Sequence, residues 1–340
     1  MITRRDILAG AAAIASLLLA APASASDAVD VQAAKAEGRV VWYTSTPIET
    51  AQKIANLFQK DTGIKVELFR SGGSAILSRF QQELTAGRVM VDLLTHSDPA
   101  AAAVMTKKGL FVPFKPQNFD KVPDAAKDAS GAYIAQRLNM MTILARTDKL
   151  TEAEIPKSWA ELTDPKYKNK LITTDPAFTS LQVSVVGMIA KTLGWEYYER
   201  LRKNDMMIVP GNQQIADNLK RGERLIAVGN ADAYAADARK EGHQIATIFP
   251  TDGLFVIPSP SSVVKGSPNP NAAKLFAEFM LSDAVQTLFP TEDGSYAARL
   301  DMPPPTGNPE LGKIKLIPVE YDYIERETPR IKKRFAEIFS

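Results

Sequence analysis

The stretch GRVVWYTSTPIETAQKIANLFQKDTGIKVELF, residues 38–69, decides the fold class. It opens at 39–44 with an apolar, β-branched and aromatic run, which predicts a buried strand. Apolar residues then recur at helical spacing, and Thr46 with Glu49 predicts a capping box at the start of that helix. A glycine ends the helix before a second predicted strand at 64–69. A strand, a helix and a second strand predict parallel strands joined by a right-handed crossover.

The alternation of strands and helices continues along the chain. Ser71-Gly72-Gly73-Ser74 leads into a predicted helix, and a third strand is predicted at 91–95. A second series is predicted with strands at 170–173, 206–209 and 225–228, helices at 181–193 and 233–241, and helices capped by Asn212 and Asn271. Two such series predict an α/β protein with mostly parallel sheets, joined by extended crossings at 132–145 and 244–258.

The composition excludes several kinds of chemistry. The 340 residues include no Cys and two His, which excludes a disulfide scaffold, a thiol nucleophile, an iron–sulfur cluster and a Cys-type zinc site. The formal net charge of +2 gives no general attraction for nucleic acid, so none is expected as a partner. No phosphate-binding loop, dinucleotide-binding, zinc-protease or nucleophile-elbow motif is present. We therefore expect no catalytic residues, no cofactor and no enzyme activity, with a secreted hydrolase kept as an alternative.

Residues 1–25 have the layout of an export signal. Arg4 and Arg5 precede an apolar stretch at 7–21, and the small residues at 23–25 offer a cleavage site. The paired arginines resemble a twin-arginine signal, although a general secretory signal is the alternative. We expect an exported periplasmic protein, without a lipid anchor because no Cys is present to carry one.

Hydroxyl-bearing residues and glycines stand before several predicted helices. Four segments share this pattern: Thr44-Ser45-Thr46, Ser71-Gly72-Gly73-Ser74, Phe178-Thr179-Ser180 and Gly211-Asn212-Gln213. A helix N-terminus presents unpaired N–H groups and a partial positive charge, which suits a phosphate, phosphonate or carboxylate. The alternative is ordinary capping, because Ser, Thr and Asn are preferred N-caps. Four such starts in two α/β units favour their convergence on one cleft.

Two other features allow a functional or a structural interpretation. His96-Ser97-Asp98 follows a predicted strand, where α/β proteins form ligand sites, although a polar loop with Asp98 before a proline is the alternative. The adjacent Tyr197-Tyr198 lies in a helical segment and is predicted to pack in the core.

Segments spread over the whole mature chain carry a family resemblance. They are 37–43 (EGRVVWY), 58–66 (FQKDTGIKV), 87–93 (GRVMVDL), 156–162 (PKSWAEL), 263–274 (VVKGSPNPNAAK) and 279–282 (FMLS). With these segments the chain resembles the periplasmic substrate-binding proteins of bacterial ABC importers, in the extracellular solute-binding group that includes ferric-iron, hexose-phosphate and phosphonate binders. The resemblance implies a type II periplasmic binding protein fold, in which two α/β lobes joined by hinge strands close on a ligand. It also implies a permease and an ATPase as partners, and we expect a monomer.

The resemblance places the lobes along the chain. We expect a signal peptide at 1–25, the first part of lobe 1 at 26–135, lobe 2 at 136–250, the return segment of lobe 1 at 251–300, and a C-terminal segment packing on the lobes at 301–340.

The ligand class has to be chosen between an anion and a metal ion. Ferric binders of this family commonly use an adjacent pair of tyrosines, and the corresponding stretch here is 230–234, where Tyr234 matches the second tyrosine and Ala233 replaces the first. We therefore predict a small anionic ligand, a phosphonate or a phosphorylated or carboxylated compound. The alternatives are Fe(III) with Tyr234 as a metal ligand, and a sensor-associated binding protein. The predicted ligand-binding residues are Thr44, Ser45, Thr46, Ser71, Gly72, Ser74, His96, Thr179, Ser180, Asn230, Asp232 and Tyr234.

Overall fold

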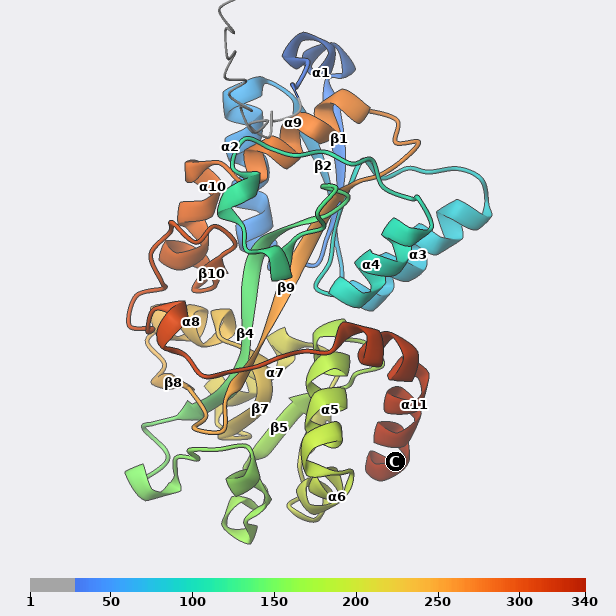
Figure 1. Ribbon diagram of the computed structural model, residues 1–340. Helices are drawn as coiled ribbons and strands as arrows, with labels where there is room; N and C mark the ends of the chain where they lie inside the picture. The colour runs from blue at the N-terminus through green and yellow to red at the C-terminus, as the bar shows by residue number, and fades with distance from the viewer. Residues whose placement is uncertain (1–27) are drawn as a thin grey trace, which may run out of the picture.

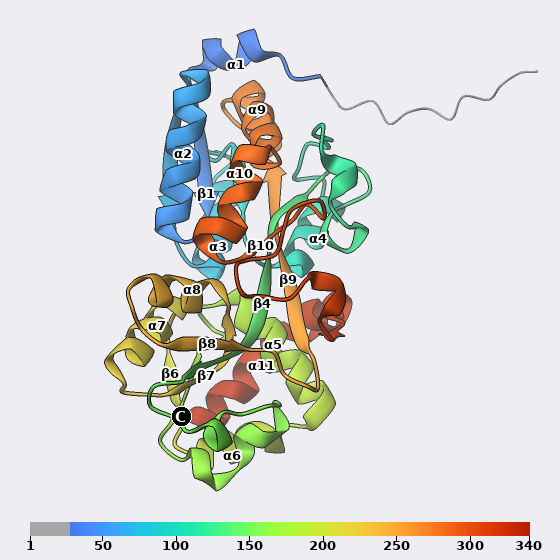
Figure 2. The same cartoon turned by 90° about the vertical axis from the view of Figure 1, so that its left-hand side faces the viewer.

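A computed structural model describes residues 28–340, and the predicted signal segment lies outside the described residues. The chain forms two lobes, one above the other in Figures 1 and 2. All main strands belong to one sheet, in the order β2-β1-β3-β9-β4-β7-β5-β6. No helix among residues 28–340 is long and apolar enough to cross a membrane.

Lobe 1 is built on the predicted parallel strands. β1 (Arg39–Thr44) pairs in parallel with β2 (Lys65–Arg70) on one side and with β3 (Leu93–Thr95) on the other. The helices of this lobe are α1 (Val31–Glu37), α2 (Ile48–Thr62), α3 (Gly73–Thr85), α4 (Pro99–Lys107), α9 (Pro270–Met280) and α10 (Asp283–Leu288). An aromatic cluster fills the space between sheet and helices, with ring centroids of Trp42 and Phe276 5.2 Å apart.

Lobe 2 repeats this arrangement with the later elements. β5 (Leu171–Thr174) pairs in parallel with β6 (Met207–Val209) and β7 (Ile226–Ala231). The helices are α5 (Ser180–Leu193), α6 (Glu196–Lys203), α7 (Asn212–Arg221) and α8 (Ala233–Lys240). Tyr197 and Tyr198 are buried on α6, with their rings packed edge to face, so the prediction that this pair packs in the core is confirmed.

Two long antiparallel strands join the lobes. β4 (Ile134–Arg146) is buried along its whole length, and β9 (Leu254–Val263) pairs with it and returns the chain to lobe 1 (Figure 1). The prediction that 132–145 crosses between the lobes is confirmed. The predicted return at 244–258 is wrong in its first half, because β8 (Ile245–Ile248) pairs with β4 inside lobe 2 and β9 makes the crossing. The predicted lobe boundaries stay a prediction, since both strands run through both lobes.

The end of the chain crosses between the lobes once more. From β10 (Tyr296–Ala297), which pairs with β4, the chain runs through β11 (Leu316–Ile317) to α11 (Tyr321–Phe339). α11 packs mainly against α5 in lobe 2 and also contacts α4 in lobe 1 (Figure 1). Short turns of helix complete the described residues: η1 (Phe119–Lys121), η2 (Asp124–Ala126), η3 (Glu152–Glu154), η4 (Ala160–Thr163), η5 (Pro165–Tyr167), the π-turn η6 (Phe289–Asp293) and η7 (Leu311–Lys313).

Three helix starts differ from the predicted ones. Thr46 does not cap α2, whose N-cap is Pro47 without a side-chain bond, because the Thr46 hydroxyl accepts hydrogen bonds from Thr44 and Gln136 instead. Gly211 rather than Asn212 is the N-cap of α7. Asn269 rather than Asn271 is the N-cap of α9, and the Asn271 side chain donates to Glu37 of α1.

Candidate functional site

A cavity of about 510 Å³ lies between the two lobes. It is lined from lobe 1 by Ser45, Arg70, Ser71, Gly72, Gly73, Ala75 and Ser97, from β4 by Arg137 and Asn139, and from lobe 2 by Phe178, Thr179, Ser180, Leu181, Pro210, Gly211, Asn212, Gln213, Gln214, Ala231 and Tyr234. We call this cavity the interlobe cleft.

The interlobe cleft lies where the parallel strands end. β1, β2 and β3 end in lobe 1 at Thr44, Arg70 and Thr95, and the segments that follow them supply the lobe 1 lining. In lobe 2 the segments after β5 and β6 do the same. Loops at the carboxyl ends of parallel strands form the ligand site in open α/β sheets, so the topology brings both sets of loops to one place.

Three helices point their N-termini at the interlobe cleft. α3 begins after Gly72 and α5 after Thr179, and neither N-cap makes a side-chain hydrogen bond to its helix. α7 begins after Gly211, whose own N–H donates to Gln214 over 2.7 Å. The N–H groups of the first turns of α3 and α5 are therefore not used by side-chain caps, and together with the helix dipoles they favour an anion.

The starts of α3 and α5 come from different lobes and lie against each other. A Cβ atom added to Gly73 would lie 2.5 Å from the Ser180 hydroxyl, and one added to Gly72 would lie 3.4 Å from the Phe178 carbonyl oxygen. Glycine at both positions therefore allows the two lobes to approach closely at this side of the cleft.

Two arginines add positive charge to the cleft. Arg70, at the end of β2, donates from Nε to the Thr46 carbonyl oxygen over 3.1 Å. Arg137, on β4, is buried and donates from Nη1 to Asp293 over 3.4 Å and to Ser295 over 3.2 Å. Its Nε is buried without a hydrogen-bond partner. A guanidinium group held by one edge in this way keeps its remaining N–H donors available for a ligand in the cleft.

Tyr234 lines the same cleft from the first turn of α8. Burial raises the pKa of its phenol, and the positive charges of Arg70 and Arg137 act in the opposite direction. All three side chains line the same cavity.

The structure divides the predicted ligand-binding residues into two sets. Six of them line the interlobe cleft together: Ser45, Ser71, Gly72, Thr179, Ser180 and Tyr234. The other six lie outside the residues that line it: Thr44, Thr46, Ser74, His96, Asn230 and Asp232.

The second set has physical reasons for its positions. The Thr44 hydroxyl donates to Thr46 over 2.8 Å, and Asn230 Oδ1 accepts from its neighbour's N–H. His96 is fully buried, and this burial lowers the pKa of its imidazole to about 4. Burial also raises the pKa of Asp232 well above its usual value, with nearby Asp293 adding to the effect.

In the loop after β3, Asp98 caps α4 by accepting from Ala101 N–H, which agrees with the polar-loop interpretation.

Arg70, Arg137 and Asn139 were not predicted from the sequence. No sequence motif marks a ligand-binding arginine at the end of an edge strand or within a crossing strand. Exposed arginines without a function are common at such positions. The signal that could have identified Arg137 is a charged residue inside the extended crossing stretch 132–145, since charges inside buried strands need a partner or a function.

The interlobe cleft has no acidic lining. None of the residues that line it is Asp, Glu or His. Among residues 28–340 no group of three or more His, Asp or Glu side chains is placed to hold a metal ion. The cleft therefore offers donors and positive charge, with a single phenol at Tyr234.

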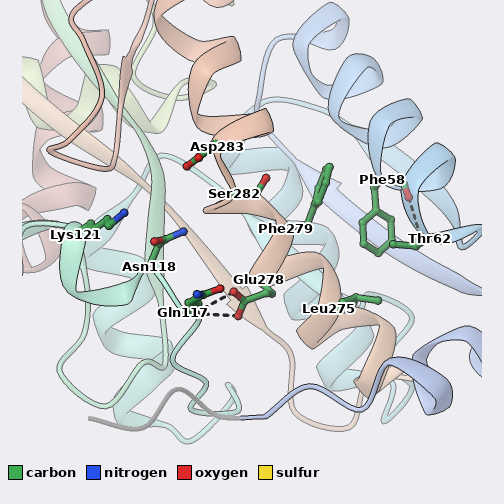
Figure 3. Close-up of a pocket in the computed structure, with 10 residues that line it drawn as sticks. All are labelled: Phe58, Thr62, Gln117, Asn118, Lys121, Leu275, Glu278, Phe279, Ser282 and Asp283. Atoms are coloured by element: carbon green, nitrogen blue, oxygen red, sulfur yellow. Dashed lines mark hydrogen bonds between the residues drawn. The ribbon is translucent and has the colours of Figure 1, made fainter. Parts of the chain in front are cut away.

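A second hollow, shown in Figure 3, differs from the cleft in its chemistry. It lies within lobe 1 beside α2 and α9, and acidic side chains of Glu278 and Asp283 take part in its lining. Glu278 accepts two hydrogen bonds from the Gln117 N–H, at 3.0 and 3.1 Å. Lys121 also lines this hollow and Asp283 is paired with Arg299, so its charges are mixed. The interlobe cleft, with two arginines and no acidic lining, is the better candidate site for an anion.

Comparison with solved structures identifies the fold. The periplasmic binding protein AfuA from Actinobacillus pleuropneumoniae, determined with fructose-6-phosphate bound, matches with a TM-score of 0.79 at 22% identity, over 89% of this chain and 98% of that one. The two-lobed architecture is thus the α/β periplasmic binding protein fold of type II, as expected from the sequence. This is the fold of the receptor class that serves ABC importers.

Sequence comparison then identifies the family. Residues 89–327 match the model of the bacterial extracellular solute-binding proteins, and the chain belongs to this family. The Fe(3+)-binding periplasmic protein of Serratia marcescens is 25% identical over 300 residues, covering 85% of this chain and 86% of the relative. A Salmonella typhimurium protein, provisionally named as a 2-aminoethylphosphonate-binding periplasmic protein, is 26% identical over 258 residues, 73% of each chain. The family consists of solute-binding proteins, so this chain is a receptor and not an enzyme.

Proposed function

We propose that this protein is a periplasmic receptor of an ABC importer and that its ligand is a small organic anion, a phosphonate or a phosphorylated or carboxylated compound. One observation carries the proposal: two arginines and three helix N-termini line the interlobe cleft, and no acidic side chain does. The names of the relatives support anions of this kind, since one was determined with a sugar phosphate and another is named for a phosphonate.

The positive charge of the cleft is local. The formal net charge of the whole chain is +2, which is too small to attract an anion over a distance. Helix N-termini and guanidinium groups act over a few ångströms, and they form charge-assisted hydrogen bonds with phosphate or carboxylate oxygens. Selectivity for anions therefore depends on the residues of the cleft and not on the surface of the molecule.

Ligand binding would stabilise the closed arrangement of the lobes. The cleft is lined from both lobes and from β4, so a ligand held there contacts Ser45 and Ser71 on one side and Thr179 and Ser180 on the other. Contacts that form on both sides only when the lobes approach shift the equilibrium toward closure. The closed receptor would then deliver its ligand to the permease and ATPase of the importer.

Fe(III) is the second candidate ligand, and one position supports it. Tyr234 lines the cleft, and a phenolate oxygen is a suitable ligand for a hard trivalent cation. The name of the Serratia relative points in the same direction. However, Arg70 lines the cleft without a carboxylate partner and would repel a bare cation, so iron would need an accompanying anion there.

A panel of ligands tests the proposal. Thermal unfolding is measured with phosphate, phosphonates, sugar phosphates, dicarboxylates, polyamines, and ferric citrate against citrate alone. A bound ligand at 100 times its Kd stabilises by about 2.7 kcal/mol. We expect organic anions to raise the melting temperature, and Arg70→Gln to weaken this binding at least tenfold. Arg88→Gln, at an exposed position outside the cleft, is the matched control.

Two results would decide against an organic anion. Stabilisation by polyamines alone contradicts the proposal outright. Stabilisation by ferric citrate but not by citrate, with a visible absorption band that disappears in Tyr234→Phe, establishes Fe(III) in its place.

A further inference from the structure

We infer that the ligand carries neutral hydrogen-bond donors, such as hydroxyl groups, beside its anionic group, and that these donors pair with the side-chain oxygens of Asn139 and Asn212. The inference rests on the proposed function, because it concerns the rest of a ligand whose charged group is held by the arginines and helix N-termini. It goes further by selecting hydroxylated anions from the wider class of organic anions.

Asn139 presents an acceptor whose orientation is fixed. Its side chain is 1% exposed, and its Nδ2 donates to the Ile257 carbonyl oxygen over 2.7 Å and to the Ser259 hydroxyl over 2.8 Å. Both amide hydrogens are therefore used, and the amide cannot turn over without losing two hydrogen bonds. Its Oδ1 is buried without a partner, and Asn139 lines the interlobe cleft.

Asn212 presents a second acceptor from lobe 2. It is the first residue of α7, is 8% exposed and lines the interlobe cleft. Its Oδ1 is also buried without a hydrogen-bond partner. A buried polar group without a partner is unfavourable, so a ligand that supplies a donor recovers the lost hydrogen bond.

Several other polar groups of the cleft are already engaged, but the buried Ser45 hydroxyl has no partner and is free to donate or accept. The Thr179 hydroxyl donates to the Pro210 carbonyl oxygen over 3.0 Å, and the Ser180 hydroxyl donates to the Ser97 carbonyl oxygen over 3.4 Å. Gln214 Oε1 accepts from the Gly211 N–H. The side-chain oxygens of Asn139 and Asn212 are thus the buried amide acceptors without a partner in the described lining of the cleft.

The charges of the cleft decide which donor fits these oxygens. An ammonium group would be a strong donor, but Arg70 lines the cleft with its charge offset by no lining carboxylate, whereas the charge of Arg137 is paired with Asp293. Asp232, which could have balanced an ammonium group, does not line the cleft. Like charges at close range are unfavourable, whereas a hydroxyl group donates to a neutral amide oxygen without adding charge. A phosphorylated polyol or a hydroxy acid therefore fits better than an amino-phosphonate or an inorganic anion.

Two matched sets of small ligands test this inference by calorimetry. The phosphate set is glycerol 3-phosphate, propyl phosphate and 3-aminopropyl phosphate, and the carboxylate set is glycerate, propanoate and β-alanine. Within a set the anionic group and the three-carbon chain stay the same, and the two hydroxyl groups are either absent or replaced by one amino group. We expect the hydroxylated member of a set to bind at least tenfold more tightly than the plain member, and the amino member to bind most weakly.

Variants of Asn212 connect this preference to the site. We expect Asn212→Ala to remove most of the advantage of the hydroxylated member, while the plain member keeps its affinity within about threefold. Asn212→Asp should turn the preference toward the amino member, because a carboxylate replaces a neutral acceptor. Asn218→Ala is the matched control, because Asn218 is a buried asparagine on the same helix outside the cleft and also has an unpartnered Oδ1. It should leave all affinity ratios unchanged.

The outcomes separate the inference from the function that it rests on. If the plain or amino member binds as tightly as the hydroxylated one, the inference is overturned and the anion receptor stands. An Asn212→Ala variant that keeps the full preference also overturns it. If none of the six compounds binds at millimolar concentration and the phosphonates, sugar phosphates and dicarboxylates of the first panel also leave the melting temperature unchanged, both the anion receptor and the inference are overturned. If only anions without a hydroxyl group bind, the inference alone is overturned.

Discussion

Arg137 is the residue on which the chemistry of the cleft depends most. It lies on β4, is buried, and is paired with Asp293, which also accepts a hydrogen bond from the Thr50 hydroxyl over 2.6 Å. Thr50 belongs to α2 and Asp293 to η6, so three separate parts of the chain fix the position of one guanidinium group. Arg70, by contrast, is anchored by one hydrogen bond to a carbonyl oxygen and is exposed.

This difference predicts different costs of removing the two arginines. Arg137→Gln leaves the buried carboxylate of Asp293 without its counter-charge, and we expect it to lower the free energy of unfolding by about 3 kcal/mol. Arg70→Gln should change it by less than about 1 kcal/mol while still weakening ligand binding. Urea unfolding measures both. Restoration of most of the stability in Arg137→Gln/Asp293→Asn would confirm the cause, and equal losses in the two single variants would contradict it.

His96 predicts a dependence of stability on pH. Its folded-state pKa of about 4 lies below the usual 6.5, because burial disfavours the charged imidazole. The unfolded chain therefore takes up a proton first as the pH falls below 6.5, and the native state loses stability between about pH 6.5 and 4. Above pH 7 this contribution is fully retained. We expect His96→Gln to lessen the loss between pH 7 and 4.5 by about 2 kcal/mol, as measured by urea unfolding. Parallel pH curves for the two proteins would rule out this role.

At the scale of elements, the regular strands and helices could be predicted, but the details of their ends could not. The apolar run at 39–44 and the spacing of Ile54 and Phe58 are local signals, and both gave the observed β1 and α2. The cap at Thr46 was wrong because its hydroxyl pairs with Gln136, 90 residues away in the sequence. A local sequence pattern cannot reveal a hydrogen-bond partner that lies so far away in the sequence.

The candidate site shows the same limit. Half of the predicted ligand-binding residues line the cleft, because hydroxyls and glycines at the starts of α3 and α5 leave a local pattern. Arg70, Arg137 and Asn139 belong to strands, and they come to line the same cavity only after β2 and β4 have assembled into the sheet. The charge of the cleft is therefore a tertiary property that single segments of sequence do not display.

The contact between α3 and α5 gives a prediction about closure. Gly73→Val adds a branched side chain where even a Cβ would lie 2.5 Å from the Ser180 hydroxyl. We expect it to keep the lobes apart, increase the radius of gyration in X-ray scattering and weaken ligand binding at least tenfold. Gly312→Val is the control, because a Cβ there meets no atom within 4 Å. An unchanged radius of gyration with normal ligand affinity would show that this contact does not limit closure.

At the scale of the whole molecule, α11 is a further connection between the two lobes. Ile324 and Ile331 of α11 are buried against α5, where Gly187 leaves room for them: a Cβ at Gly187 would lie 2.6 Å from Ile331 and 2.7 Å from Ile324. The same helix contacts α4 of the other lobe. The lobes are thus joined by β4 and β9 and also by the last segment of the chain.

This connection predicts that a mutation far from the cleft has a large effect on the stability of the protein. We expect Ile331→Ala to lower the free energy of unfolding by about 3 kcal/mol, because it opens a cavity at the contact between α11 and α5. Lys333→Ala, with an 80% exposed side chain on the same helix, should change it by less than about 0.5 kcal/mol. Denaturant unfolding of the two variants provides the measurement, and similar values for both would mean that α11 contributes little to stability.

The positions of α1 and α11 have a practical consequence for observing this receptor at work. α1 packs on α9 at the far end of lobe 1, and α11 packs on α5 in lobe 2 (Figure 2). The sequence contains no cysteine, so cysteines introduced at the exposed Val31 and Lys333 would be the only sites for thiol-reactive dyes. Energy transfer between the two dyes would report each rotation of one lobe against the other, and the receptor would become an optical sensor for its own ligand.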